Sequence, residues 1–168
     1  MTLATLVLAL VTAQRLGELV LARRNTRRLL AQGAYEVGAG HYPIVVALHA
    51  AWLGSLWLLA WDAPVDPSWL AVYIVLQALR LWVLASLGPR WTTRIIVLPG
   101  APLARRGPSR FVSHPNYVVV AAEIAVLPLV FGEWQVAVIF SVLNAIILFV
   151  RIREEERALD PRRTLSVH

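Results

Sequence analysis

The sequence predicts an all-α, polytopic membrane protein with about five transmembrane helices, the last two of which form a helical hairpin. Of its 168 residues, 58% are hydrophobic and only 15% are charged, which is too apolar for an ordinary soluble domain. Hydropathy finds five stretches that approach the roughly 20 apolar residues needed to cross a bilayer. In lipid, only helices or closed barrels satisfy the backbone, and the chain has little room for strands.

The five expected spans follow one another in a simple order. They cover residues 3–22, 43–61, 69–87, 118–131 and 134–150. The fourth is short, and it is expected to pair with the fifth as a tight hairpin because only Gly132 and Glu133 separate the two. The loop 88–113 is the largest polar segment and is expected to fold over the membrane surface, as functional lids often do.

A chain of this length predicts a single domain, residues 1–168. Within it, residues 1–106 hold the N-terminal helices and loops, residues 107–159 hold the motifs described below, and residues 160–168 form a short tail. The chain has no cysteine, which excludes disulfides, thiolate metal sites and a cysteine nucleophile. Histidine and carboxylate residues lack metal-ligand spacing, so we expect no metal site.

The net charge of +6 comes from arginines whose placement indicates topology. They cluster after the first, third and fifth spans, whereas the connectors after the second and fourth carry only Asp62, Asp66 and Glu133. The positive-inside rule then predicts a multi-pass protein of the cell membrane, with its N-terminus outside and its C-terminus in the cytoplasm. The arginines are expected to contact anionic membrane lipids, and a nucleic-acid partner is not expected.

Charged residues inside the spans predict contacts between helices. Arg15 and Glu18 are spaced i,i+3 and can meet on one face of the first span. Arg80 in the third span is expected to snorkel or to pair with Glu18 or Glu123. For Glu123 two interpretations stay open, a substrate-site carboxylate or a salt bridge to Arg80. His49 lies alone on an apolar face and is expected to be a hydrogen-bonded core residue rather than a ligand.

Polar residues at the end of the fifth span form a stripe. Asn144, Arg151 and Glu155 are spaced i, i+7 and i+11, which keeps them on one side of a helix. Such residues can also be a simple cytoplasmic collar of charge. A second polar cluster, Ser113-His114-Pro115-Asn116-Tyr117, leaves the membrane on the same side. Because desolvating such groups is costly, we expect the two clusters to be halves of one site.

The glycine-rich segment 38–43 does not fit a phosphate-binding loop. No strand is expected before it, and it lacks both the lysine and the third glycine that such loops use. A flexible turn before the second span is the simpler interpretation, with a role in gating substrate left open.

Three motifs in order resemble the isoprenylcysteine carboxyl methyltransferase family of integral membrane methyltransferases. They are Gly107-Pro108-Ser109-Arg110, Ser113-His114-Pro115-Asn116-Tyr117 and Arg151-Ile152-Arg153-Glu154-Glu155-Glu156-Arg157-Ala158-Leu159. The N-terminal half is similar to a bacterial branch associated with O-methylation of long-chain alkylpyrones and alkylresorcinols. Ser109 and Ser113 stand where the family usually has an aromatic residue and an arginine. A Phe-Gly-x-x-Tyr continuation is absent, which makes a prenylated protein C-terminus a less expected acceptor.

This resemblance implies S-adenosylmethionine as the methyl donor, bound at the cytoplasmic ends of the last two helices. The acceptor would be a lipophilic molecule that carries a carboxyl or hydroxyl group, either isoprenylcysteine-like or a long-chain polyketide lipid. Arg151 and Glu155 are the expected catalytic residues, with Glu155 as a base for a hydroxyl. The expected cofactor-binding residues are His114, Pro115, Tyr117, Arg151, Glu155 and Glu156, and the expected substrate-binding residues are Glu123 and Asn144.

Two alternatives stay open. One is an NADPH-dependent membrane reductase, because sterol and steroid reductases have a similar C-terminal hairpin. The other is a non-enzymatic scaffold or transporter whose polar residues only pack helices, although no inverted repeat is visible.

Overall fold

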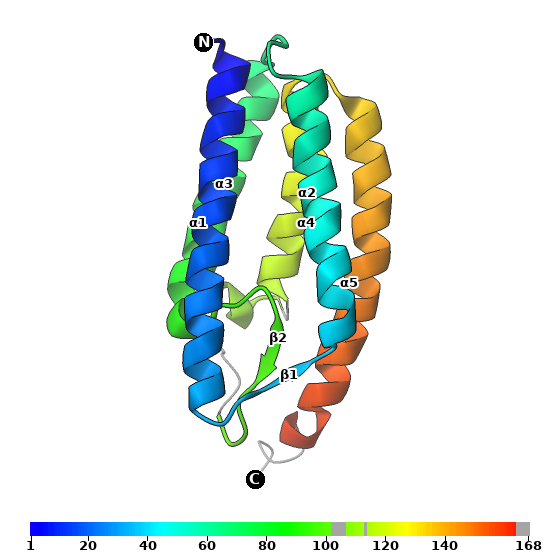
Figure 1. Cartoon of the computed structure of the whole chain (residues 1–168). Helices are drawn as coiled ribbons and strands as arrows, with labels where there is room; N and C mark the ends of the chain where they lie inside the picture. The colour runs from blue at the N-terminus through cyan, green and yellow to red at the C-terminus, as the bar shows by residue number, and fades with distance from the viewer. Residues whose placement is uncertain (102–106, 113, 164–168) are drawn as a thin grey trace.

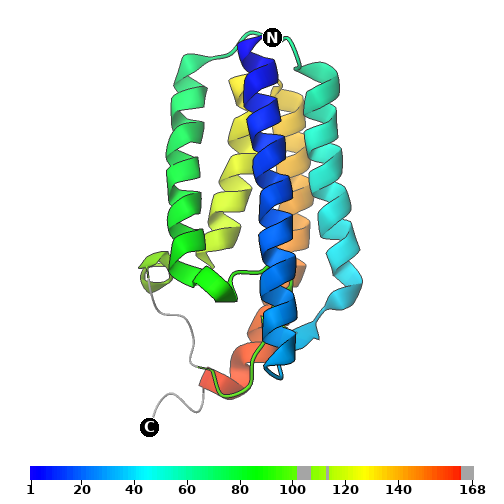
Figure 2. The same cartoon turned by 60° about the vertical axis from the view of Figure 1, so that its left-hand side comes forward.

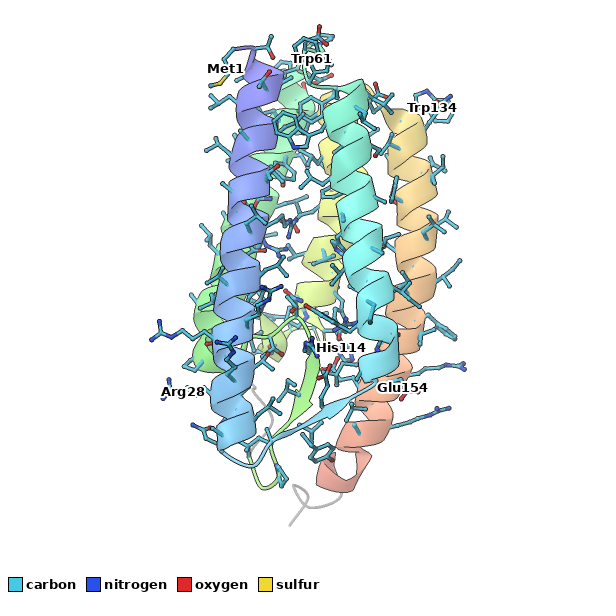
Figure 3. All side chains as sticks on the ribbon, viewed as in Figure 1. Met1, Arg28, Trp61, His114, Trp134 and Glu154 are labelled. Atoms are coloured by element: carbon cyan, nitrogen blue, oxygen red, sulfur yellow. The ribbon has the colours of Figure 1, made fainter. Side chains whose placement is uncertain are left out.

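The computed structural model describes residues 1–101, 107–112 and 114–163, with side chains up to residue 158. Arg105, Arg106, Ser113, the side chain of Leu159 and the end of the tail therefore lie outside the described residues. Five α-helices run side by side along one axis, and the two chain ends lie at opposite ends of the bundle (Figures 1 and 2). Figure 3 shows Met1, Trp61 and Trp134 at one end, the tryptophan end, and Arg28, His114 and Glu154 toward the other, the arginine end.

The expected all-α fold is confirmed. The helices are α1 (Leu3–Ala31), α2 (Tyr42–Leu59), α3 (Pro67–Leu87), α4 (Pro115–Val130) and α5 (Trp134–Arg163). Four of them are long and apolar enough to cross a membrane, and α4 is a shorter apolar helix. The last two helices form the expected hairpin, with Gly132 at a φ of 76° in the turn between them. This backbone region is open to glycine at no steric cost.

Two helices run further than the hydropathy of the sequence predicted. We expected the first span to end at residue 22 and the fifth at residue 150, but α1 continues to Ala31 and α5 to Arg163. Hydropathy marks only the part of a helix that lies in lipid. The extensions are rich in arginine, leucine, alanine and glutamate, which favour helix in water as well. Both helices therefore project beyond the apolar region at the arginine end.

A short strand pair lies at the arginine end and was not predicted. Strand β1 (Tyr35–Val37) pairs antiparallel with β2 (Ile95–Val97), with Tyr35 opposite Val97. Strands of three residues are too short to give a clear alternating pattern in sequence. The pair ties the connector between α1 and α2 to the loop after α3 (Figure 1). Within the described residues, three short 3₁₀ turns lie in the connectors, at Ala39–His41, Gly88–Arg90 and Gly107–Arg110.

The hydrophobic core occupies the half of the bundle near the tryptophan end. Leu8, Leu56 and Leu127 have no exposed surface there. The hydroxyls of Thr2 and Thr5 both donate to the carbonyl of Trp61, at 3.0 and 2.6 Å. These contacts fasten the start of α1 to the connector between α2 and α3, so the apolar half is closed at its outer end.

Candidate active site

A cluster of four charged side chains joins α1, α3 and α4 in the middle of the bundle. Glu18, Arg80 and Glu123 are buried, and Arg15 is partly buried. Arg80 bonds both carboxylate oxygens of Glu18, and its Nη1 lies 2.6 Å from Oε2 of Glu123. Arg15 reaches the same oxygen of Glu123 at 2.9 Å and Glu18 at 3.4 Å. The expected pairing of Arg80 is therefore confirmed, and it involves both glutamates. Two cations and two carboxylates balance, which makes this burial tolerable in an apolar medium.

Glu123 has both oxygens engaged within this cluster. Gln77 donates to Oε1 at 2.8 Å, the two arginines hold Oε2, and the side chain has no exposed surface. The salt-bridge interpretation is thus confirmed. A role in substrate binding stays a prediction, and Glu123 does not line the cavity described next.

A largely apolar cavity of about 280 Å³ lies beside the charge cluster, toward the arginine end. All five helices contribute to its wall, together with residues 91–93 of the loop after α3. Asn144, one of the expected substrate residues, lines it from α5 and is almost fully buried. An apolar cavity with a few polar groups is typical of a small-molecule site.

The two polar clusters found in the sequence meet at the arginine end. Tyr117 donates its hydroxyl to Oε2 of Glu155 at 2.7 Å, and Nδ1 of His114 lies 3.6 Å from the same oxygen. Nε2 of His114 lies 3.9 Å from Glu156, and its ring stacks on Tyr117 with centroids 5.4 Å apart. Pro115 is buried in the first turn of α4, where its fixed backbone suits a helix start. It separates His114 from Asn116 and Tyr117.

Arg151 connects this cluster to the cavity. It lines the cavity, is 5% exposed, and donates from Nη2 to the carbonyl of Thr93 at 2.9 Å. Its guanidinium carbon lies 5.6 Å from the ring centre of Tyr117. Among the residues that the structure describes, Nε of Arg151 and Nε2 of His114 are buried without a hydrogen-bond partner. Buried polar atoms of this kind are costly unless something binds them, so both atoms are available to a polar ligand.

Several residues near the site were not predicted from the sequence. Nδ2 of Asn25 donates to the carbonyl of Trp91 at 2.8 Å, and Nε1 of Trp91 donates to Oδ1 of Asn116 at 3.3 Å. The hydroxyl of Tyr42 lies 3.1 Å from Oγ1 of Thr93. The available signals were weak: an asparagine inside an arginine run, and an aromatic residue followed by two threonines in a polar loop. Tyr42, from the segment 38–43, lines the cavity rather than forming only a turn.

The strand pair is closed by an ion pair next to the cavity. Nη1 of Arg94 lies 2.9 and 2.7 Å from the two oxygens of Glu36, and its guanidinium stacks 4.2 Å from the ring centre of Tyr42. The hydrogen bond to Glu36 raises the pKa of Arg94 above its usual value. Arg94 therefore links the strands to a residue of the cavity wall.

The chain is similar in sequence to a known family and to two bacterial proteins. The model of the isoprenylcysteine carboxyl methyltransferase (ICMT) family matches residues 69–161, more than half of the chain. The chain is 40% identical to the uncharacterized protein YpbQ of Bacillus subtilis (strain 168), over 92% of this chain and 95% of that protein. It is 26% identical to an uncharacterized protein of Haemophilus influenzae, over 90% of this chain and 92% of that protein. No solved structure matches it.

Proposed function

The chain belongs to the isoprenylcysteine carboxyl methyltransferase family of membrane methyltransferases, and we propose that it transfers a methyl group from S-adenosylmethionine to the oxygen of a lipophilic acceptor. The observation that supports this most is the convergence of His114, Tyr117, Arg151 and Glu155 at the end of an apolar cavity. A polar cofactor and a lipid can meet at such a boundary.

The residues at the arginine end fit the proposed cofactor. When bound, S-adenosylmethionine supplies a methyl group on a positively charged sulfur. Its ammonium and ribose hydroxyls are donors, and Glu155 and Glu156 can accept from them. Its carboxylate suits Arg151, whose Nε is buried without a partner among the residues described. His114 offers a second such nitrogen, Nε2.

Arg151 and Glu155 are proposed to act mainly by positioning. Methyl transfer is an in-line displacement, so much of the rate comes from alignment and from excluding water. Tyr117 holds the carboxylate of Glu155, and Thr93 holds Arg151. Both side chains are therefore oriented before any ligand binds.

The cavity is the proposed place of the acceptor. Leu16 on α1 and Val46 on α2 line it and are also 59% and 39% exposed on the outer surface. An alkyl chain can thus reach the cavity sideways from the bilayer, between α1 and α2. Asn144 would contact the polar head of the acceptor, and Glu123 would act through Arg15, which it holds at the cavity wall. Long-chain resorcinols, pyrones and isoprenylcysteine-like lipids all suit this shape.

We place the site at the cytoplasmic face of the cell membrane. Arg28 lies at the same end as His114 and Glu154, whereas Trp61 and Trp134 lie at the other (Figure 3). Arginines favour the cytoplasmic side and tryptophans favour the interfaces. This orientation gives a water-soluble methyl donor direct access from the cytoplasm.

Cofactor binding by the purified protein in detergent tests the proposal. We expect S-adenosylmethionine to bind, and Arg151→Ala to weaken binding about 10- to 150-fold, the loss of a charge-assisted hydrogen bond. Arg157→Ala is the matched control, because Arg157 is highly exposed and contacts only Glu154 among the residues described. Equal effects of the two variants would favour a simple charge collar. Binding of NADPH instead would favour the reductase, to which the family match already runs counter.

A further inference from the structure

His49 on α2 lines the cavity. One of its ring nitrogens makes a hydrogen bond within the helix, and the other can contact a ligand. Its Nδ1 lies 2.8 Å from the carbonyl of Val45, one turn back on the same helix. A carbonyl oxygen can only accept a hydrogen bond, so Nδ1 must carry the proton. In the neutral imidazole, Nε2 then holds the lone pair. The expectation of a hydrogen-bonded histidine is met by this contact, but the contact also prepares Nε2 as a base.

His49 shares its depth in the cavity with Asn144. Tyr42 on α2 and Arg151 on α5 both contact Thr93, which places these two residues at one level. His49 is seven positions beyond Tyr42, and Asn144 is seven positions before Arg151. Since α2 and α5 run in opposite directions, both residues lie about 10 Å deeper than the Thr93 level, at 1.5 Å per residue. An imidazole and an amide therefore flank the inner part of an apolar cavity.

The other titratable groups of the cavity wall each have at least one partner. They are Arg15 and Glu18 on α1, Tyr42 on α2, Arg80 on α3, Tyr117 on α4 and Arg151 on α5. Glu18 is held by Arg80, the hydroxyl of Tyr117 by Glu155, and that of Tyr42 by Thr93. The arginines stay protonated. A neutral imidazole can accept a proton at its free nitrogen, so His49 is the group of the wall suited to take one.

Glu155, the base expected from the sequence, has a different environment. Its Oε2 accepts the hydroxyl of Tyr117 and faces His114, and Glu155 does not line the cavity. It faces the side proposed for the methyl donor. His49 instead faces the space proposed for the acceptor.

We propose that His49 accepts, at Nε2, the proton of the acceptor's hydroxyl group. This inference rests on the proposed function and assigns a residue of that site to the proton transfer. A carboxylate arrives ionised and needs no base, whereas a phenol, with a pKa near about 10, benefits from one. The lone pair on Nε2 is therefore useful for a hydroxyl acceptor and not for a carboxylate.

In the proposed step, the proton leaves the acceptor as the methyl group arrives. The acceptor oxygen forms a bond to the methyl carbon while its proton passes to Nε2 of His49. The bond from that carbon to the cationic sulfur breaks, and its electron pair stays on sulfur as a neutral thioether. The positive charge has moved from sulfur to the imidazolium, which releases its proton to water when the products leave.

The first test compares His49→Asn with His41→Asn. The asparagine amide can keep the bond to the Val45 carbonyl but removes Nε2, and His41 lies outside the cavity wall. With an alkylresorcinol and labelled S-adenosylmethionine, we expect His49→Asn to lower turnover about 100- to 10,000-fold at unchanged cofactor affinity. The rate at which a long-chain carboxylic acid is methylated should stay that of the wild type. His41→Asn should resemble the wild type, and Glu155→Gln should weaken cofactor affinity.

A second readout needs no methyl donor. A long-chain alkyl nitrophenol absorbs visible light only when ionised, so its spectrum reports proton transfer inside the cavity. We expect the wild type to increase the ionised band near neutral pH and His49→Asn to lose that increase. His49→Gln replaces His49→Asn if the latter does not fold.

The outcomes separate the two proposals. Full turnover of the resorcinol by His49→Asn, or an ionised band equal to that of the wild type, overturns the role of His49. Failure of the wild type to bind S-adenosylmethionine overturns the proposed function instead. In that case the nitrophenol spectrum alone supports or overturns proton acceptance by His49.

Discussion

The two halves of the bundle are filled in opposite ways. Near the tryptophan end, leucines from α1, α2 and α4 pack with no exposed surface. Toward the arginine end, α1, α3 and α4 carry the cluster of four charged side chains, and all five helices surround a cavity of about 280 Å³. Dense apolar packing gives stability without chemistry, whereas buried charge and empty space cost stability. One half of the bundle can therefore hold the helices in place while the other half accommodates ligands.

Removing one carboxylate from the charge cluster should have the largest effect on stability. Glu123→Gln keeps the shape of the side chain but removes one of the two carboxylate charges that Arg15 and Arg80 share. We expect a loss of about 3–5 kcal/mol in the free energy of unfolding, the usual cost of breaking a buried ion pair. Thermal or denaturant unfolding in detergent measures this. A loss below that of an exposed variant such as Glu154→Gln would mean that the cluster is not a stabilising unit.

A variant at the next residue probes the apolar half. Ile124 is 1% exposed within the core, and Ile124→Val removes one methylene there. We expect a loss of about 0.5–1.5 kcal/mol in unfolding free energy, with no change in affinity for S-adenosylmethionine. Unfolding curves and cofactor titrations on the same preparation check both parts. A change in cofactor affinity would show that the two halves are coupled.

The partly exposed ion pair between Arg94 and Glu36 should matter least for global stability. Arg94→Gln removes the contacts to Glu36 and the stacking on Tyr42. Because partly exposed pairs contribute little, we expect a loss of only about 0.2–1 kcal/mol in unfolding free energy. Amide hydrogen exchange in β1 and β2 should nevertheless become faster than in the helices, and the effect should shrink in high salt. Exchange that stays unchanged would mean that the strands are held by their backbone bonds alone.

Sequence reasoning located the helices because lipid requires long apolar runs. The sequence also predicted that His114 and Tyr117 lie near Glu155. The number of spans between them places both helix ends on the same side of the membrane. The choice among partners of Arg80 depended on how each helix is rotated about its axis. Hydropathy does not report that rotation, so the sequence could not predict that Arg80 pairs with both glutamates.

Several unpredicted contacts of the site are made to backbone atoms. Asn25 binds the carbonyl of Trp91, and Arg151 binds that of Thr93. Every residue has a carbonyl group, so such contacts leave no signature in the types of residue along the chain. The strand pair was missed for a related reason, because three residues such as Ile95–Val97 are shorter than any reliable periodicity.

The distribution of the buried charges also bears on how the chain is inserted during synthesis. A charge at the centre of a single helix costs about 2.5–3.5 kcal/mol during insertion by the translocon. Arg15 and Glu18 pair within α1, which can insert with its charges already matched. Glu123 belongs to a short helix, and its partner Arg80 lies on α3. Because α3 emerges from the ribosome first, we expect α4 to enter the bilayer against it, so that the two helices insert as one unit.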